Sequence, residues 1–327
     1  MNVFYTCDNN YIWLMGISAI SLFENNRHIP DLIVYLLGEN INAENKGILC
    51  GIAQQYHRKI IVIDIPGLDI PETLVSKRWP LSAFTRLFAA TLLPEEMDRA
   101  LYLDCDTIIC GDIGQIGGVD VAENIFWGVK DCVGSAYKEN IGLKKQDVYI
   151  NAGVLLINLK ELRKVNVSTL MKQYMKKYGN RINYADQDIL NGVFYGQIGL
   201  LHPKYDVMTI GAVHSYQEIQ ILRKPANYYT EEELRAAVLD PVIIHYTTNM
   251  RVIRPWYSNT NHPLAAEFRR YFDISPWNEK VLQDMVFSTK EARLIGLIQK
   301  LPRRISYRLL GLIHAQLKPY YIRLQAK

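Results

Sequence analysis

An apolar run leads directly into two acidic residues in the stretch Ala100-Leu101-Tyr102-Leu103-Asp104-Cys105-Asp106. Four apolar residues in succession are typical of a strand that is buried in a sheet. Side chains alternate along a strand, so Asp104 and Asp106 project to the same side of the chain. Because two neighbouring carboxylates repel one another unless a cation neutralises them, this pattern favours a hard divalent ion that takes oxygen ligands.

Apolar runs of strand length recur along the chain, with helical patterns between them. The strand-like runs are Asn2–Cys7, Leu32–Leu37, Ile60–Ile65, Arg99–Leu103, Ala152–Leu159 and Val242–Ile244. Helical patterns cover 13–23, 43–56 and 81–90, and another helix starts at Asp186. Strands that alternate with helices are typical of a parallel sheet covered by helices, so we predict an α/β fold.

The composition is that of an ordinary globular protein. Of the 327 residues, 49% are hydrophobic and 21% are charged, which excludes a disordered or low-complexity chain. The net charge of +4 is unevenly distributed. Residues 290–327 hold nine basic side chains and one acidic, whereas the first 289 residues hold 28 basic and 32 acidic ones. A slightly acidic body with a basic tail argues against nucleic-acid binding, for which the body would need a basic surface.

The cysteines and the N-terminus indicate the compartment. Five cysteines without Cys-x-x-Cys spacing predict no disulfide framework and favour a reducing environment. The N-terminus shows no signal-peptide pattern, and no apolar run approaches the ~20 residues that a membrane-spanning helix needs. We therefore expect a cytoplasmic protein.

The segment after Pro276 has a different pattern. Arg and Lys lie among apolar residues at helical spacing, and Pro302 interrupts the run. The apolar positions are Leu294, Leu297, Ile298, Leu301, Ile305, Leu309, Leu312, Ile313, Leu317 and Tyr321. We predict a body at 1–275 and two basic amphipathic helices at 276–327. Such helices either bind an anionic membrane surface or pack on the body or on a partner subunit.

Several polar residues stand at strand and helix ends. Asp8, Asn9 and Asn10 follow the first strand in place of the glycines of a dinucleotide-binding loop, so a Rossmann pyrophosphate site is not expected. They either contact a base or ribose, or cap the next helix. Arg86 lies among apolar residues and pairs either with a ligand or with a structural carboxylate. His245 follows a short strand and could add an imidazole ligand to the metal.

Two further motifs adjoin regular elements. Asn151-Ala152-Gly153 leads into a strand, where small residues allow a ligand to approach the backbone closely. Asp186-Gln187-Asp188 opens a helix, where acidic residues also complement the helix dipole without any further role.

Taken in their order along the chain, these motifs resemble those of glycosyltransferase family 8. The members of this family are retaining enzymes and include bacterial lipopolysaccharide galactosyl- and glucosyltransferases. The resemblance runs from Thr6 to about Trp256. The motifs that carry it are Thr6-Cys7-Asp8-Asn9-Asn10-Tyr11, Phe84-Thr85-Arg86-Leu87, the stretch from Ala100 to Asp106, Tyr149–Leu159 and Asp186–Gly192. It implies a GT-A fold, which is a mixed Rossmann-like sheet flanked by helices, and hexose transfer from a UDP-sugar with Mn²⁺ or Mg²⁺.

The resemblance also implies a role for each motif residue. The uracil would be bound by Asp8, with Thr6, Asn10 and Tyr11 beside it. The metal would be held by Asp104, Asp106 and His245, with Cys105 between the two aspartates in the donor site. The donor sugar would contact Arg86, Asp131, Asn151, Ala152, Asp186 and Gln187.

The loop after His245 departs from the family pattern. It runs Tyr246-Thr247-Thr248-Asn249-Met250-Arg251-Val252-Ile253-Arg254-Pro255-Trp256, lacks the family's Gly, is longer, and has Arg254 where the family has Lys. Arg254 or Arg251 could still bind phosphate oxygens.

Retention requires either a covalent intermediate with two inversions or attack on the same face within an ion pair. Because the amide of Gln187 is neutral and a poor nucleophile, we expect it to stabilise an oxocarbenium-like sugar; Asp188 is the alternative nucleophile. The implied acceptor is a cell-surface glycan or glycolipid such as lipopolysaccharide core, reached at the inner face of the membrane through the tail. The alternatives are a glycosylated protein acceptor, and a degenerate member that binds a nucleotide or glycan without transfer.

Overall fold

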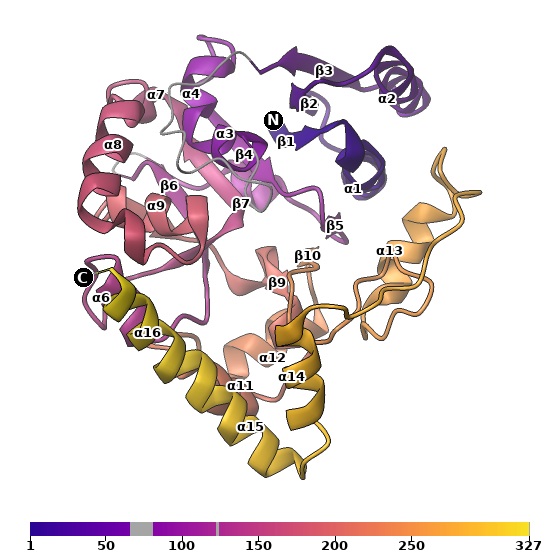
Figure 1. The fold of residues 1–327 in the computed structure, drawn as a ribbon. Helices are drawn as coiled ribbons and strands as arrows, with labels where there is room; N and C mark the ends of the chain where they lie inside the picture. The colour runs from indigo at the N-terminus through magenta and orange to yellow at the C-terminus, as the bar shows by residue number, and fades with distance from the viewer. Residues whose placement is uncertain (66–80, 122–123, 327) are drawn as a thin grey trace.

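A seven-stranded sheet forms the centre of the protein in the computed structural model, which describes residues 1–65, 81–121 and 124–326 (Figure 1). The strand order is β3-β2-β1-β4-β7-β6-β8. The strands are β1 (Asn2–Asp8), β2 (Ile33–Glu39), β3 (Lys59–Asp64), β4 (Arg99–Leu103), β6 (Phe126–Lys130), β7 (Ile150–Asn158) and β8 (Ile198–Leu200). Strands β3, β2, β1 and β4 are parallel, whereas β7 is antiparallel to both β4 and β6. The expected mixed α/β sheet is therefore confirmed.

Helices cover both faces of this sheet. The larger ones are α1 (Ile12–Asn25), α2 (Ala43–Gln55), α8 (Val167–Tyr178) and α9 (Ala185–Val193). Helices α1 and α2 lie on one side and α8 and α9 on the other (Figure 1). Leu101 packs in the core under α1, whereas the next residue, Tyr102, packs in the core under α8 and α9. Because β4 and β7 are buried on both faces, they appear in the sequence as unbroken apolar runs.

The helix predicted at 81–90 is interrupted. It consists of α3 (Leu81–Thr85), a 3₁₀ turn η3 (Arg86–Phe88) and α4 (Ala89–Leu92). The turn begins at Arg86, whose Nε donates to the carbonyl oxygen of Ala83 at 3.1 Å. This side-chain bond turns the guanidinium back toward the sheet instead of toward solvent.

A second, three-stranded sheet has the order β5-β10-β9. Its strands are β5 (Thr107–Ile109), β9 (Val207–Met208) and β10 (Ile243–His245). His245 pairs with Thr107 on one side and with Met208 on the other. Because β5 follows β4 after three residues, this small sheet brings the end of β10 to the end of β4. Sequence patterns did not indicate β5 or β9, which have three and two residues.

The other described helices outside the tail have between three and nine residues. They are η1 (Asn9–Tyr11), α5 (Gly114–Gly117), α6 (Ser135–Asn140), α7 (Leu159–Leu162), η4 (Gly179–Arg181), η5 (Pro203–Tyr205), α10 (Thr209–Val213), α11 (Tyr216–Arg223), α12 (Glu231–Leu239) and α13 (Ala265–Phe272).

The tail forms two helical rods, as expected. One is α14 (Lys290–Ile298); the other runs without a break through α15 (Arg303–Leu312), the π-helical segment η6 (Ile313–Leu317) and α16 (Lys318–Gln325). Pro302 lies between the rods and begins the second, which runs from α11 back to α6 (Figure 1). One side of the tail packs on the body, burying Ile298 and Leu310 against Leu222. Among the described helices, none is long and apolar enough to cross a bilayer.

Candidate active site

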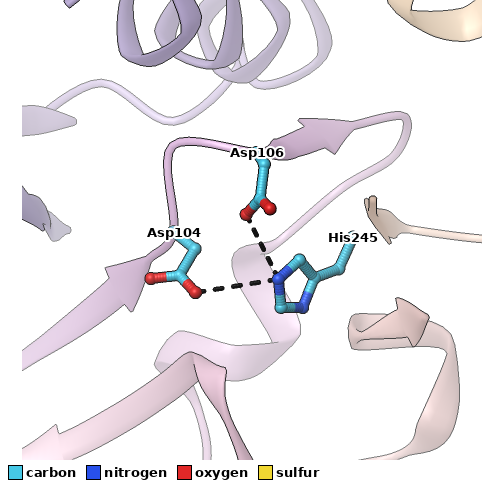
Figure 2. Close-up of side chains that lie close together, drawn as sticks. All are labelled: Asp104, Asp106 and His245. Carbon is cyan, nitrogen blue, oxygen red and sulfur yellow. Dashed lines mark ion pairs between the residues drawn. The ribbon is translucent and has the colours of Figure 1, made fainter. Parts of the chain in front are cut away.

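Three predicted metal ligands converge between the two sheets. Asp104 directly follows β4, Asp106 precedes β5, and His245 ends β10. The Nε2 atom of His245 lies 3.2 Å from Asp106 Oδ1 and 3.7 Å from Asp104 Oδ2 (Figure 2). One ligand atom from each of the three lies within 4.8 Å of the others. Two hard carboxylates and one imidazole are a donor set that suits Mn²⁺ and accepts Mg²⁺, so these residues fit a divalent ion.

Charge is concentrated in this cluster. Burial opposes ionisation of Asp106, but His245 and Arg254 together hold the pKa of its carboxyl below the ordinary value. Burial likewise opposes the charge on His245, yet Asp106 and Asp206 raise its pKa well above the usual range. A cation bound at Nε2 would have to displace that proton, so ion binding would be coupled to proton release.

A cavity of about 250 Å³ adjoins the cluster. It is lined by Thr6, Cys7, Asp8, Tyr11, Ala83, Arg86, Asp104, Cys105, Asp106 and Arg254. Most of the predicted nucleotide residues are among them; Asn10 instead lines a neighbouring cavity that shares Tyr11. Asp8 Oδ1 accepts a bond from the Asn10 amide at 2.8 Å and so caps the 3₁₀ turn η1. Asp8 therefore caps the turn and lines the cavity, and its contact with a base or ribose stays a prediction.

Arg86 connects the metal cluster to the predicted donor-sugar residues. Its Nη1 lies 3.0 Å from Asp104 Oδ1 and donates to the Ala152 carbonyl at 2.6 Å. Its Nε lies 3.2 Å from Asp186 Oδ2, and its guanidinium stacks over the Tyr102 ring. Burial raises the pKa of Asp186 to about 6 even though Arg86 lowers it. The sequence left the partner of Arg86 open, and the structure supplies two carboxylates, of which Asp104 lines the cavity.

Gln187 is fixed by four hydrogen bonds. Its Oε1 accepts from Asn151 Nδ2 and from the Ala152 amide, both at 3.1 Å. Its Nε2 donates to Asp131 Oδ2 at 2.9 Å and to the Tyr149 hydroxyl at 3.2 Å. The side chain is therefore held in one orientation among the residues predicted to contact the sugar.

Asp188 has a different environment. One of its carboxylate oxygens accepts from the Tyr149 hydroxyl at 2.6 Å, and the other from the amides of Asn183 and Tyr184 at 2.7 and 2.8 Å. The side chain is buried, and burial raises the pKa of its carboxyl. A carboxylate with both oxygens bonded to its own surroundings stabilises the start of α9.

The loop after His245 still brings an arginine to the cavity. Arg254 lines it, with Nη2 3.9 Å from Asp106 Oδ2, and its guanidinium stacks over Trp256. Arg251 instead stacks over Phe287, toward the tail. Of the two arginines that the sequence offered, Arg254 is thus the one at the site.

The sequence did not indicate a role for Asp206, and it suggested that a ligand approaches the backbone at Gly153. Asp206 Oδ1 lies 3.0 Å from His245 Nδ1, and no motif marks this aspartate. An added Cβ at Gly153 would lie 2.2 Å from His245 Cε1, so the group that approaches this glycine is the imidazole and not a ligand.

Comparison with known proteins agrees with this arrangement. The family model described as glycosyl transferase family 8 matches residues 2–260. The chain belongs to glycosyltransferase family 8. It is therefore a glycosyltransferase, and the GT-A fold implied by the resemblance is confirmed by the solved structures that follow.

Individual relatives of this family 8 chain have low sequence identity to it, but the similarity extends over most of the chain. General stress protein A of Bacillus subtilis is 23% identical, covering 85% of this chain and 95% of that protein. A lipopolysaccharide 1,2-glucosyltransferase of Escherichia coli is 28% identical, covering 84% of this chain and 79% of that enzyme. The crystal structure of galactosyltransferase LgtC with donor and acceptor sugar analogues superposes with a TM-score of 0.69 at 22% identity, over 86% of this chain and all of that one.

Proposed function

We propose that this chain is a retaining, metal-dependent hexosyltransferase that moves galactose or glucose from a UDP-sugar to a cell-surface glycan such as lipopolysaccharide core. The observation that carries the proposal is the cluster of Asp104, Asp106 and His245, whose two aspartates line a cavity that Arg86 links to the predicted sugar residues. The relationship to an enzyme named for lipopolysaccharide glucosylation supports the acceptor class.

The proposed chemistry follows from where charge develops. As UDP departs, positive charge builds on the sugar and negative charge on the diphosphate. A divalent ion bound by the cluster would supply electrostatic stabilisation of the diphosphate. Arg254, on the cavity wall, would hold phosphate oxygens in place. Asp186, whose buried Oδ2 lies 3.2 Å from Arg86 Nε but accepts no hydrogen bond, would accept one from a sugar hydroxyl.

Gln187 would stabilise the oxocarbenium-like sugar within an ion pair. Its four hydrogen bonds hold the amide dipole in place before the reaction, so no reorganisation is needed as charge develops. A covalent route through Asp188 would first have to break the bonds that hold this carboxylate at the start of α9. The geometry therefore favours the ion-pair route.

The test is UDP release from a panel of UDP-sugars, with and without Mn²⁺ or Mg²⁺. We expect one donor to be turned over only with metal, and the Asp104→Asn/Asp106→Asn double variant to be inactive. The exposed Asp240→Asn provides a matched control for loss of a carboxylate. UDP binding without turnover of any donor, after lipid-linked and protein-linked glycans have been supplied as acceptors, would instead support a degenerate binding protein.

We also propose that the tail holds the enzyme on an anionic bilayer. The tail exposes nine large apolar side chains: Leu294, Leu297, Leu301, Ile305, Leu312, Leu317, Tyr320, Tyr321 and Leu324. Exposed basic residues lie among them, including Arg293, Lys300, Arg304 and Arg308. Each basic residue near an anionic surface contributes about 1 kcal/mol. Only one side of the tail packs on the body, which leaves the other side available to lipid.

Co-sedimentation with phosphatidylglycerol vesicles tests this proposal. We expect Leu312→Ser/Leu317→Ser, which leaves the packed side of the tail intact, to reduce binding strongly. Leu239→Ser removes an apolar side chain that is exposed elsewhere, so it should bind as the wild type does. Equal binding by all three proteins would rule out the tail as the membrane contact.

A further inference from the structure

The imidazole of His245 is held from two sides by groups outside the predicted metal cluster. Its Nδ1 lies 3.0 Å from Oδ1 of Asp206, at the ring nitrogen not used by Asp104 and Asp106. The side chain of Asp206 is fully buried, and that of His245 is 5% exposed. Strand β9 pairs with β10 directly after Asp206, so the backbone fixes the carboxylate beside Nδ1.

The second contact is with Gly153 on β7, which has no side chain. An added Cβ there would lie 2.2 Å from Cε1, 2.7 Å from Nδ1 and 2.9 Å from Nε2 of His245, closer than real Cβ contacts allow. The ring thus lies flat against the β7 backbone. Any side chain at position 153 would displace the ring from the plane in which Nε2 faces the two aspartates.

A metal-binding histidine needs one ring nitrogen free of a proton and aimed at the ion. A carboxylate accepts hydrogen bonds and cannot donate one, so an ionised Asp206 requires the Nδ1 of His245 to carry the proton. The Nε2 atom is then the one available to a cation. Charge on the carboxylate also makes the ring a stronger electron donor.

We propose that Asp206 and Gly153 are positioning residues for the cation: Asp206 selects the tautomer of His245, and Gly153 fixes the plane of its ring. This inference rests on the metal-dependent function proposed above. Neither residue touches the cation; both act through His245.

The isosteric variant Asp206→Asn separates tautomer selection from packing. The second carboxylate oxygen of Asp206, Oδ2, is buried without a hydrogen-bond partner. If the amide oxygen of Asn faced Nδ1, its two N–H groups would be left unpaired at that buried position. The other orientation donates one N–H to Nδ1 and leaves one N–H and the carbonyl oxygen unpaired, which costs less because a buried carbonyl oxygen tolerates the lack of a partner better than an N–H does. His245 would then carry its proton on Nε2, facing Asp106, and that nitrogen could not bind a metal.

The experiment measures cation affinity without any donor sugar. Free Mn²⁺ is titrated by electron paramagnetic resonance against wild type, Asp206→Asn and Gly153→Ala. The control is Asp112→Asn, because Asp112 forms a surface pair with His28 Nε2 at 3.1 Å, away from the cluster. We expect the two positioning variants to bind Mn²⁺ about 10- to 100-fold more weakly and the control to match wild type. Thermal unfolding checks that each variant is folded.

A second measurement needs no variant. In ¹⁵N-histidine spectra of the wild type with diamagnetic Mg²⁺, we expect one histidine with a protonated Nδ1 and a metal-shifted Nε2. An unprotonated Nδ1 at His245 would overturn the proposal, as would Mn²⁺ affinity within twofold of wild type for folded Asp206→Asn. If Asp206→Asn does not fold, the proposal is tested by the histidine spectra of the wild type and by the Mn²⁺ affinity of Gly153→Ala. A wild type that binds no divalent ion would refute the metal-dependent function itself. Metal-dependent turnover by the wild type, together with unchanged Mn²⁺ affinity in Asp206→Asn, would refute only this inference.

Discussion

Replacement of Arg86 by Met should destabilise the protein and should do so more at high pH than at low pH. Met fills most of the space of the Arg stem but leaves Asp104 and Asp186 without their shared cation. Loss of one partner from a buried ion pair costs about 3–5 kcal/mol. Because the Asp104 side chain is 25% exposed and solvent screens part of its charge, we expect about 3 kcal/mol at pH 8.

The pH dependence follows from Asp186, whose pKa is raised to about 6 in the folded protein, from about 3.9 in an unfolded chain. A carboxyl with a raised folded pKa loses stability as pH rises from the unfolded to the folded value. In Arg86→Met the folded pKa rises further, so the variant continues to lose stability above pH 6 while the wild type does not. At pH 5 Asp186 is largely neutral in both folded proteins, and the difference between them should shrink.

Urea unfolding at pH 5 and pH 8 measures both effects. Arg163→Met is the matched control, because Arg163 donates to three backbone carbonyls, those of Ala90, Pro94 and Met97, and pairs with no carboxylate among the residues that the structure describes. Its cost should be the same at both pH values. An equal cost of Arg86→Met at pH 5 and pH 8 would refute the reasoning from the two carboxylates.

Four other variants, with one control for the tail, test separate parts of the site and the tail. Gln187→Ala should lower kcat at least 100-fold with little change in donor KM, and retention of most of kcat would refute a catalytic role for Gln187. Asp188→Asn should chiefly lower the melting temperature. Asp186→Asn should raise the stability at pH 8 by about 3 kcal/mol, because burial disfavours the ionised carboxyl, and should impair turnover; urea unfolding and a UDP-release assay measure the two effects. Gly311→Leu should detach the second tail helix, because an added Cβ would lie 2.1 Å from a backbone oxygen of α11. Proteolysis of the tail should therefore increase. In the control Gly51→Leu an added Cβ has no atom within 4 Å, so proteolysis of the tail should not change.

Local pattern was sufficient for the elements with a strong period. Strand β4 and its two aspartates were predicted because a strand buried on both faces leaves an unbroken apolar run. The tail helices were predicted because an apolar stripe with basic residues beside it has a helical period. Strands β5 and β9, of three and two residues, are too short to show any period, and no sequence pattern indicated them.

The chemistry of the site divides in the same way. By itself, the sequence determined which residues are able to bind a metal or a sugar, because a residue's type fixes its donors, acceptors and charge. Only the tertiary structure decided which of them meet. The small sheet places His245 beside Asp106, and Arg86 turns inward to join Asp104 with Asp186. Asp206 and Gly153 could not be recognised in the sequence, because their effect on His245 depends on contacts that form only when β7, β9 and β10 come together.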